Sequence, residues 1–304
     1  MNDLQNRIIK LKKEKRALIL AHYYQTLDIQ EIADVVGDSF EMARQAREAQ
    51  ENLLVVCGVH FMAESAKILS PQKTVLLPMK SAGCPMADMI TAKDITDMRD
   101  RHPNAAVVCY VNTSAQIKAV SDVCCTSSSA EKIVRALPQK QIIFVPDRNL
   151  GAYIASRVPE KEIILFEGYC PIHDRVTKDI VIAAKSAHPS AKLLAHPECR
   201  PEVLDLSDFI GSTTGIINEA LTSEASEFII GTESEIVERL KTLAPSKTFY
   251  PLASGFLCPD MKKTKLSDVL RALEEGDYEI SLYEKVSAAA GNSLELMVSL
   301  GAVK

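Results

Sequence analysis

The chain has 304 residues, of which 47% are hydrophobic and 25% are charged, and these values are ordinary for a folded globular protein. They exclude a collagen-like, coiled-coil or disordered chain, and no apolar run reaches the ~18 residues that a membrane helix requires. The net charge of −5 excludes the overall basic character of many nucleic-acid-binding proteins. Because the N-terminus has no apolar signal core, we expect a cytoplasmic protein with neither membrane nor nucleic acid as a partner.

The first predicted element is a helix over residues 3–16, in which apolar residues recur at spacings of three and four. The same spacing predicts helices over residues 92–101, 177–187 and 265–275. Short runs that are apolar on both faces alternate with the helices. This alternation favours small parallel sheets covered by helices.

A repeated pattern divides the chain. Cys84, Cys170 and Cys258 each follow an apolar run and a loop, each precede a proline, and are 86 and 88 residues apart. The segments ADVVGDS, SDVCCTS and SDFIGST recur at the same period and end in Ser39, Ser127 and Thr213. Three apolar runs upstream also correspond, and they end at His22, Asn112 and His196.

The repeats predict an α/β protein of three similar αβα domains with small parallel sheets, arranged around a pseudo-threefold axis. We place the repeats at residues 1–84, 85–170 and 171–258. A C-terminal helical segment over residues 259–304 is expected to complete the first repeat. Because ligands bind at the carboxyl ends of parallel strands, the polar residues at the strand ends would meet in one central cavity.

Cysteine is the unusual residue type, with eight in a chain that we expect to be cytoplasmic. Metal binding or catalysis is then more common than disulfide formation. The three periodic cysteines suggest three thiolate ligands, for zinc with an added histidine or for an iron–sulfur cluster with one iron open to substrate. The purely structural alternative is that all three are core residues. The remaining cysteines lie in or beside apolar runs, as core residues do: Cys57, Cys109, Cys124, Cys125 and Cys199.

A rival metal site is also present in the sequence. Two pairs with suitable spacing could together form a Cys2His2 zinc site, namely Cys170 with His173 and His196 with Cys199. Neither pair recurs in the other repeats. The three periodic cysteines are therefore the stronger hypothesis.

The strand-end residues suit an anionic ligand. Histidines can donate hydrogen bonds to carboxylate or phosphate, and hydroxyls beside helix starts can do the same or cap the helix: His22, His196, Ser39, Ser127 and Thr213. Three further side chains could transfer protons, and of these a partly buried glutamate is the natural general base: Tyr24, Tyr110 and Glu198.

Distinct motifs occur in order between residues 21 and 262: AHYYQ, GDS, VVCGVHFMAESAKIL, AGCPMAD, YVNTSA, CCTSS, PDRNLG, AHPEC, GSTTG, GTE and LCPDMK. Together they resemble the quinolinate synthase family of NAD biosynthesis. The resemblance implies three αβα domains and a [4Fe-4S] cluster on Cys84, Cys170 and Cys258. It also implies a transferase that condenses iminoaspartate with dihydroxyacetone phosphate to quinolinate, with loss of phosphate and water.

The resemblance carries over to single residues. It implies substrate binding by His22, Ser39, Tyr110, Val111, Asn112, Ser127, His196, Pro197, Glu198 and Thr213. It implies catalytic roles for Tyr24, Glu198, His22 and Tyr110, with the cluster acting as a Lewis acid. A transient contact with the enzyme that produces iminoaspartate is the expected protein partner.

Three other classes of protein fit part of the pattern. A different iron–sulfur hydro-lyase would hold the same cluster without consuming a triose phosphate. A zinc hydrolase would use the Cys2His2 set and would be colourless, whereas a redox sensor would need the cluster but neither Tyr24 nor Glu198. Visible absorption and metal content after anaerobic purification distinguish zinc from an iron–sulfur cluster.

Overall fold

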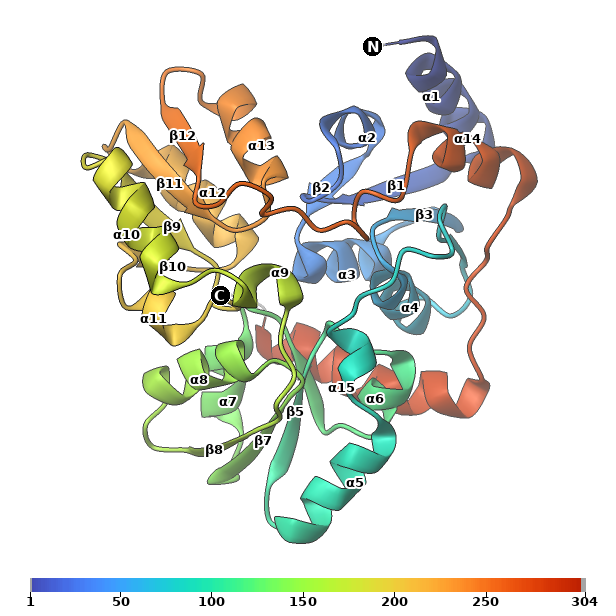
Figure 1. Ribbon diagram of the computed structural model, residues 1–304. Helices are drawn as coiled ribbons and strands as arrows, with labels where there is room; N and C mark the ends of the chain where they lie inside the picture. The colour runs from blue at the N-terminus through green and yellow to red at the C-terminus, as the bar shows by residue number, and fades with distance from the viewer. Residues whose placement is uncertain (1, 302–304) are drawn as a thin grey trace.

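Three parallel sheets, each of four strands, make up the core of the protein. The structure, a computed structural model, describes residues 2–301. The strand orders are β2-β1-β3-β4, β6-β5-β7-β8 and β10-β9-β11-β12, so every sheet has the same topology. Helices flank each sheet, and the three lobes surround a common centre (Figure 1). The predicted fold of three similar αβα domains is confirmed.

We call the three sheets with their helices the first, second and third units. The strands of the first unit are β1 (Ala17–His22), β2 (Val35–Gly37), β3 (Leu53–Cys57) and β4 (Thr74–Leu76). Its helices are α1 (Asp3–Lys15), α2 (Leu27–Ile32), α3 (Ser39–Glu48) and α4 (His60–Leu69).

The second unit repeats this order after a 3₁₀ turn, η1 (Ala87–Met89). Its strands are β5 (Ala106–Tyr110), β6 (Val123–Cys125), β7 (Gln141–Val145) and β8 (Glu162–Leu165). Its helices are α5 (Ala92–Arg101), α6 (Ala115–Ala119), α7 (Ala130–Ala136) and α8 (Arg148–Arg157).

The third unit has one more short helix. Its strands are β9 (Lys192–Ala195), β10 (Phe209–Ile210), β11 (Glu227–Gly231) and β12 (Thr248–Pro251). Its helices are α9 (Pro171–Asp174), α10 (Lys178–Ala187), α11 (Pro201–Leu204), α12 (Thr213–Thr222) and α13 (Glu235–Leu243).

The predicted helices are present, and their limits have local causes. The helices predicted over residues 3–16, 92–101, 177–187 and 265–275 correspond to α1, α5, α10 and α14 (Leu266–Glu275). Asn2 and Gln5 form a capping box that starts α1, and Thr91 and Asp94 do the same for α5. Helix α1 ends one residue before the predicted limit because Arg16 takes a left-handed conformation, with φ of 49°.

The aspartate in each repeated segment has one structural task. Its carboxylate accepts a hydrogen bond from a backbone N–H in the first strand of its own sheet, in the pairs Asp34–Ile19 (2.8 Å), Asp122–Val107 (2.7 Å) and Asp208–Leu193 (2.7 Å). A cation from the helix that precedes the first strand of the sheet (α1, α5 or α10) pairs with each carboxylate. The pairs are Lys12–Asp34 (2.8 Å), Arg99–Asp122 (2.9 Å) and Lys185–Asp208 (3.1 Å). The repeat therefore fixes where the second strand of each sheet begins.

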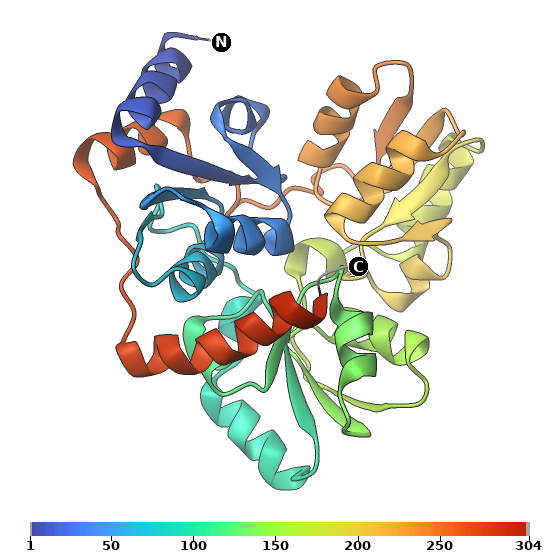
Figure 2. The same cartoon turned by 180° about the vertical axis from the view of Figure 1, so that it is seen from behind.

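Two C-terminal helices follow the third unit and pack in different places. Helix α14 packs on α1 and β3 of the first unit, next to the N-terminal helix. Helix α15 (Glu284–Gly301) packs on α6, α7 and β6 of the second unit and on α4 of the first, and it lies across the back of the molecule in Figure 2. The predicted repeat limits stay a prediction, because the contacts of residues 259–301 are shared between two units.

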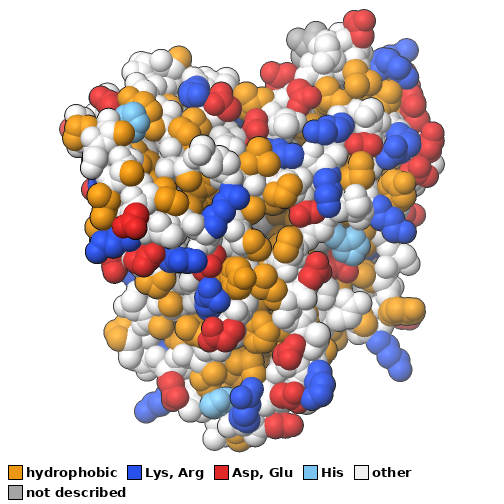
Figure 3. All heavy atoms as spheres, viewed as in Figure 1, with side chains coloured by type: hydrophobic (Ala, Val, Ile, Leu, Met, Phe, Trp, Pro, Cys, Tyr) orange, Lys and Arg blue, Asp and Glu red, His pale blue; other side chains and the backbone are white. Residues whose placement is uncertain are grey.

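The surface has no single dominant charge on the face in Figure 3, where acidic and basic side chains are interspersed. Within residues 2–301, no helix is both long and apolar enough to cross a membrane.

The packing of α15 makes a prediction about stability. Leu294 is fully buried in the core between the first and second units, whereas Leu296 on the same helix is 36% exposed. We expect Leu294→Ala to lower the free energy of unfolding by about 2–5 kcal/mol, because it removes buried methyl groups and leaves a cavity. The matched change Leu296→Ala should cost no more than about 0.5 kcal/mol in urea unfolding of the same protein. Equal losses in the two variants would contradict the packing described here.

Candidate active site

The carboxyl ends of the three sheets surround one cavity of about 220 Å³. Twelve of the residues to which the family resemblance assigns a role line it: His22, Tyr24, Ser39, Cys84, Tyr110, Asn112, Ser127, Cys170, His196, Glu198, Thr213 and Cys258. Val111 and Pro197 are buried beside the strand ends but are not part of the cavity wall. All three units therefore contribute to one site, as expected of parallel strands that end at a shared centre.

Glu198 lies in the middle of the polar groups in this cavity. It follows β9 by three residues and is only 4% exposed. Its Oε1 accepts a hydrogen bond from the Tyr110 hydroxyl at 2.6 Å, and its Oε2 lies 2.9 Å from Nδ1 of His173. Burial by itself would raise the pKa of Glu198, but His196, His173 and the hydrogen bond from Tyr110 lower it below its ordinary value. The buried carboxylate is thus held ionised by the groups around it.

A chain of hydrogen bonds leads from Glu198 to Tyr24. Nε2 of His173 lies 3.1 Å from the Thr232 hydroxyl, which in turn lies 2.7 Å from the Tyr24 hydroxyl. Because Nδ1 of His173 faces a carboxylate, that nitrogen carries the hydrogen, and Nε2 accepts from Thr232. The Tyr24 hydroxyl also lies 3.0 Å from that of Thr213. The cavity therefore contains a continuous polar path from the first unit to the second.

The two strand-end histidines are neutral hydrogen-bond donors. Nδ1 of His22 accepts from the Tyr24 N–H at 3.1 Å, and Nδ1 of His196 accepts from the Glu198 N–H at 3.3 Å. Each ring must then carry its hydrogen on Nε2, which in His196 lies 3.2 Å from the Ser127 hydroxyl. Burial lowers the pKa of His22 to about 3 and that of His196 to about 4. Both side chains can therefore donate to an anion without being charged.

Asn112 presents an unused acceptor to the same cavity. Its Oδ1 is buried and has no hydrogen-bond partner among the described residues, although the side chain lines the cavity wall. Since an unpaired buried carbonyl oxygen is unfavourable, a bound molecule with a hydroxyl or N–H group would supply the missing partner.

The three periodic cysteines meet at the cavity and fit a metal cluster. Cys84, Cys170 and Cys258 are half-buried and free, and they come from the loops that follow the three sheets. Burial raises the pKa of each thiol, to about 12 for Cys84, and the charge of a neighbouring cysteine raises the pKa of Cys84 and Cys170 further. Thiolates that destabilise one another in this way are the donors that a cationic metal centre binds.

One group of donor atoms could also hold a single ion. Among the described residues, Cys170, His173 and Glu198 have ligand atoms within 4.8 Å of one another. Cys199, the fourth member of the rival zinc site, does not join them: it is fully buried in the third unit, where its Sγ contacts the Gly231 carbonyl oxygen at 3.5 Å. The Cys2His2 arrangement is therefore not formed. Cys57, Cys109, Cys124 and Cys125 are fully buried in the core, as predicted.

Two residues of the polar path were not among the predicted catalytic residues. His173 appeared in the sequence only as a zinc ligand of the rival site, and Thr232 appeared only as part of the GTE motif. Thr232 directly follows β11, so the strand-end rule, applied to the third strand of the repeat as well as to the first, would have found it. Nothing in the sequence alone shows that His173 reaches Glu198.

The chain is similar to known proteins over nearly its whole length. A family model described as "Quinolinate synthetase A protein" matches residues 6–299. The quinolinate synthase of Caldicellulosiruptor bescii is 53% identical over 298 residues, which cover 98% of each chain. That of Clostridium perfringens is 50% identical over 299 residues, covering 98% of this chain and 99% of the relative. Quinolinate synthase 2 of Methanosarcina acetivorans is 49% identical over 293 residues, covering 96% and 94%.

The buried neutral His22 makes a prediction about acid stability. Its pKa falls from 6.5 to about 3 on folding, so between these pH values the unfolded chain binds a proton that the folded chain does not. The free energy of unfolding must then fall as the pH falls through this window, by about 1.4 kcal/mol per pH unit at most. We expect His22→Asn, which keeps an acceptor for the Tyr24 N–H, to show a shallower decline between pH 6 and pH 5.

Urea unfolding of the metal-free protein at several pH values measures this slope. His60→Asn, a change at an exposed histidine, controls for the general effect of replacing a histidine. An unchanged slope in His22→Asn would contradict the assignment of His22 as neutral.

Proposed function

Since this chain belongs to the quinolinate synthase family, we propose that its central cavity is the active site in which quinolinate is made. The observation that carries this proposal is the meeting of three cysteines with His22, Tyr24, Tyr110 and Glu198 in one cavity. The reaction proposed is the condensation of iminoaspartate with dihydroxyacetone phosphate, with loss of phosphate and water. This assigns the enzyme to the transferases and to NAD biosynthesis.

The cofactor proposed is a [4Fe-4S] cluster on Cys84, Cys170 and Cys258. Three thiolates leave one iron without a protein ligand, and when bound the cluster supplies that iron as a Lewis acid for a substrate carboxylate or nitrogen. The reaction needs no net oxidation or reduction, so an electron carrier is not required. His173, with Nδ1 at 3.3 Å from Sγ of Cys170, lies beside one ligand and orients it.

Substrate binding is proposed for the donors that line the cavity. Both substrates carry anionic groups, which suit the neutral N–H and O–H donors of this cavity. The donors are Nε2 of His22 and His196 and the hydroxyls of Ser39, Ser127 and Thr213. Asn112 offers its free Oδ1 to a substrate hydroxyl or N–H. Val111 and Pro197 would support these groups through the backbone next to the cavity wall.

Proton transfer is proposed along the hydrogen-bonded path. Each loss of water needs a proton removed from carbon or nitrogen and a proton delivered to the departing oxygen, and loss of phosphate needs a proton removed from the substrate. Tyr24 and Glu198 stand at opposite ends of the link through Thr232 and His173, so a proton taken at one end can be replaced from the other. Tyr110, which donates to Glu198, fixes the carboxylate and can orient the triose part of the substrate.

Two further predictions from the sequence belong with this proposal. The cytoplasm is the proposed location, in keeping with thiols that are all free in the described residues. The enzyme that produces iminoaspartate is the proposed transient partner, because a reactive imine is best transferred over a short distance.

The cluster assignment predicts a difference between two cysteine variants. We expect Cys84→Ser to bind less iron than the wild type after anaerobic reconstitution and to form no quinolinate, because the cluster loses one of three ligands. Cys57→Ser, at a fully buried cysteine outside the cavity, should keep its iron and its visible absorption. Iron and sulfide content, absorption and quinolinate formation are measured on each. A wild-type protein that binds zinc and stays colourless would overturn the proposal.

The proton path predicts that two small changes act alike. Tyr24→Phe and Thr232→Val each remove one hydroxyl from the path without changing its shape. We expect each to lower kcat by about 10²-fold while the cluster remains, since general acid–base transfer contributes about 10²–10⁴-fold. The double variant should be little worse than either single variant, because both belong to one path. Additive losses would show that the two hydroxyls act separately.

A further inference from the structure

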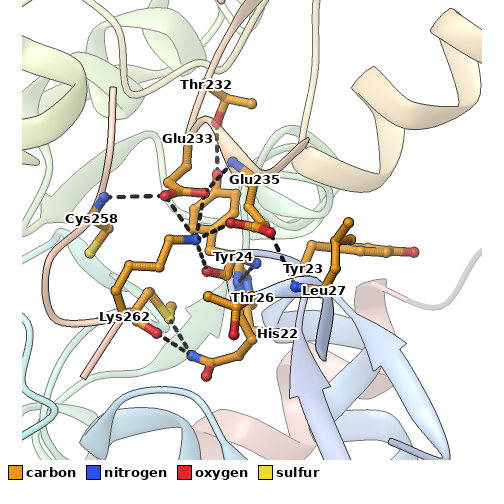
Figure 4. A network of polar contacts seen from close by, with 12 residues as sticks. His22, Tyr23, Tyr24, Thr26, Leu27, Thr232, Glu233, Glu235, Cys258 and Lys262 are labelled. Carbon is orange, nitrogen blue, oxygen red and sulfur yellow. Dashed lines mark hydrogen bonds and ion pairs between the residues drawn. The ribbon is translucent and has the colours of Figure 1, made fainter. Parts of the chain in front are cut away.

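Lys262 is a nearly buried lysine whose contacts join separate parts of the site. It stands four residues after Cys258, and its side chain is 12% exposed. Figure 4 shows its ammonium group among three oxygen acceptors from two units of the protein. The acceptors are the backbone carbonyl of Tyr24 and the carboxylates of Glu233 and Glu235. No role was predicted for Lys262 from the sequence.

The carboxylate of Glu233 connects Lys262 to the segment that carries Cys258. Glu233 is fully buried, and its Oε1 lies 3.1 Å from Nζ of Lys262. The same oxygen accepts a hydrogen bond from the backbone N–H of Cys258 at 3.3 Å. Its Oε2 accepts from the N–H of Glu235 at 2.9 Å, at the start of α13. One carboxylate thus joins the third cysteine to the third sheet.

The ammonium group connects the same segment to the first unit. Its hydrogen bond to the Tyr24 carbonyl reaches the loop that follows β1, two residues after His22, the last residue of that strand. Next to it, Nε2 of Gln25 donates to the Met261 carbonyl oxygen at 2.7 Å. In the first bond the segment after Cys258 donates to the loop after β1, and in the second bond the loop donates to that segment. Movement of Cys258 would therefore move the backbone of Tyr24.

We propose that Lys262 is a positioning residue, which together with Glu233 fixes the cluster ligand Cys258 and the tyrosine Tyr24 relative to one another. The inference rests on the proposed cluster, since it concerns one of the cysteines assigned to it. Partners of this kind orient a metal ligand without touching the metal. A buried lysine must have its charge paired, so an alternative is that Lys262 only neutralises Glu233.

The experiment compares Lys262→Met with the wild type and with Lys241→Met. The latter breaks an exposed ion pair with Glu238 in the same unit, so it controls for the loss of a lysine. Each protein is reconstituted anaerobically with iron and sulfide, and the rate of iron release to a ferrous chelator is recorded. We expect release from Lys262→Met to be about 10-fold faster, within the range typical of changes around metal ligands. Lys241→Met should match the wild type.

Steady-state kinetics provides the second measurement. Lys262 contacts no residue assigned to substrate binding, and it reaches the proposed catalytic residue Tyr24 only through its backbone. We therefore expect kcat to fall about 10-fold with little change in KM. A general loss of structure would instead lower the fraction of active enzyme and the melting temperature together.

A double variant separates positioning from charge neutralisation. Lys262→Met combined with Glu233→Gln removes the fully buried carboxylate together with the lysine, while Glu235 keeps its hydrogen bond from the Leu27 N–H. It serves if Lys262→Met alone does not fold. Fast iron release and low kcat in the double variant support the proposal. Wild-type values in the double variant overturn it, as does a Lys262→Met protein that behaves like Lys241→Met. A wild-type protein that binds no iron overturns the proposed cluster, and this inference with it.

Discussion

The ionised carboxylate of Glu198, buried among hydrogen-bond donors, is the constraint on which the central site depends. A carboxylate cannot remain charged in a protein interior unless nearby groups replace the water that it has lost. Here the replacements come from different parts of the chain: Tyr110 at the end of β5, and His173 on α9. The cavity therefore exists in its polar form only when the second and third units are correctly docked. The polar contacts of the cavity thus depend on how these two units pack against each other.

A symmetric scaffold supports an asymmetric site. The three sheets share one strand order, and each unit supplies one cysteine from the loop that follows its last strand. The groups proposed to carry protons do not repeat in this way, since Tyr24, Tyr110 and Glu198 each come from a different unit and differ in chemistry or position. Equivalent backbone positions carry the three cysteines, whereas the other polar side chains of the cavity differ from unit to unit.

The short segment after Cys258 links the third unit to the first. It connects the third sheet to α14, which packs on the N-terminal helix, and it passes the loop after β1 on the way. Lys262 connects the segment to the Tyr24 carbonyl of the first unit, and Glu233 of the third unit accepts hydrogen bonds from Lys262 and from the Cys258 N–H. Because hydrogen bonds to charged groups are stronger than neutral ones, the loop that carries Cys258 is held in place although it belongs to no regular element.

The sequence by itself determined the repeat, the helix–strand order and most of the polar side chains and cysteines of the cavity wall. Those properties follow from periodic patterns, because the carboxyl ends of all strands in a parallel sheet lie at the same edge, where ligands bind. Only the tertiary structure decided which wall residues touch. The link from Tyr24 through Thr232 and His173 to Glu198 spans 174 residues of sequence, and the bond from Lys262 to the Tyr24 carbonyl spans 238. No local pattern encodes such contacts, because they depend on how three separately folded sheets dock.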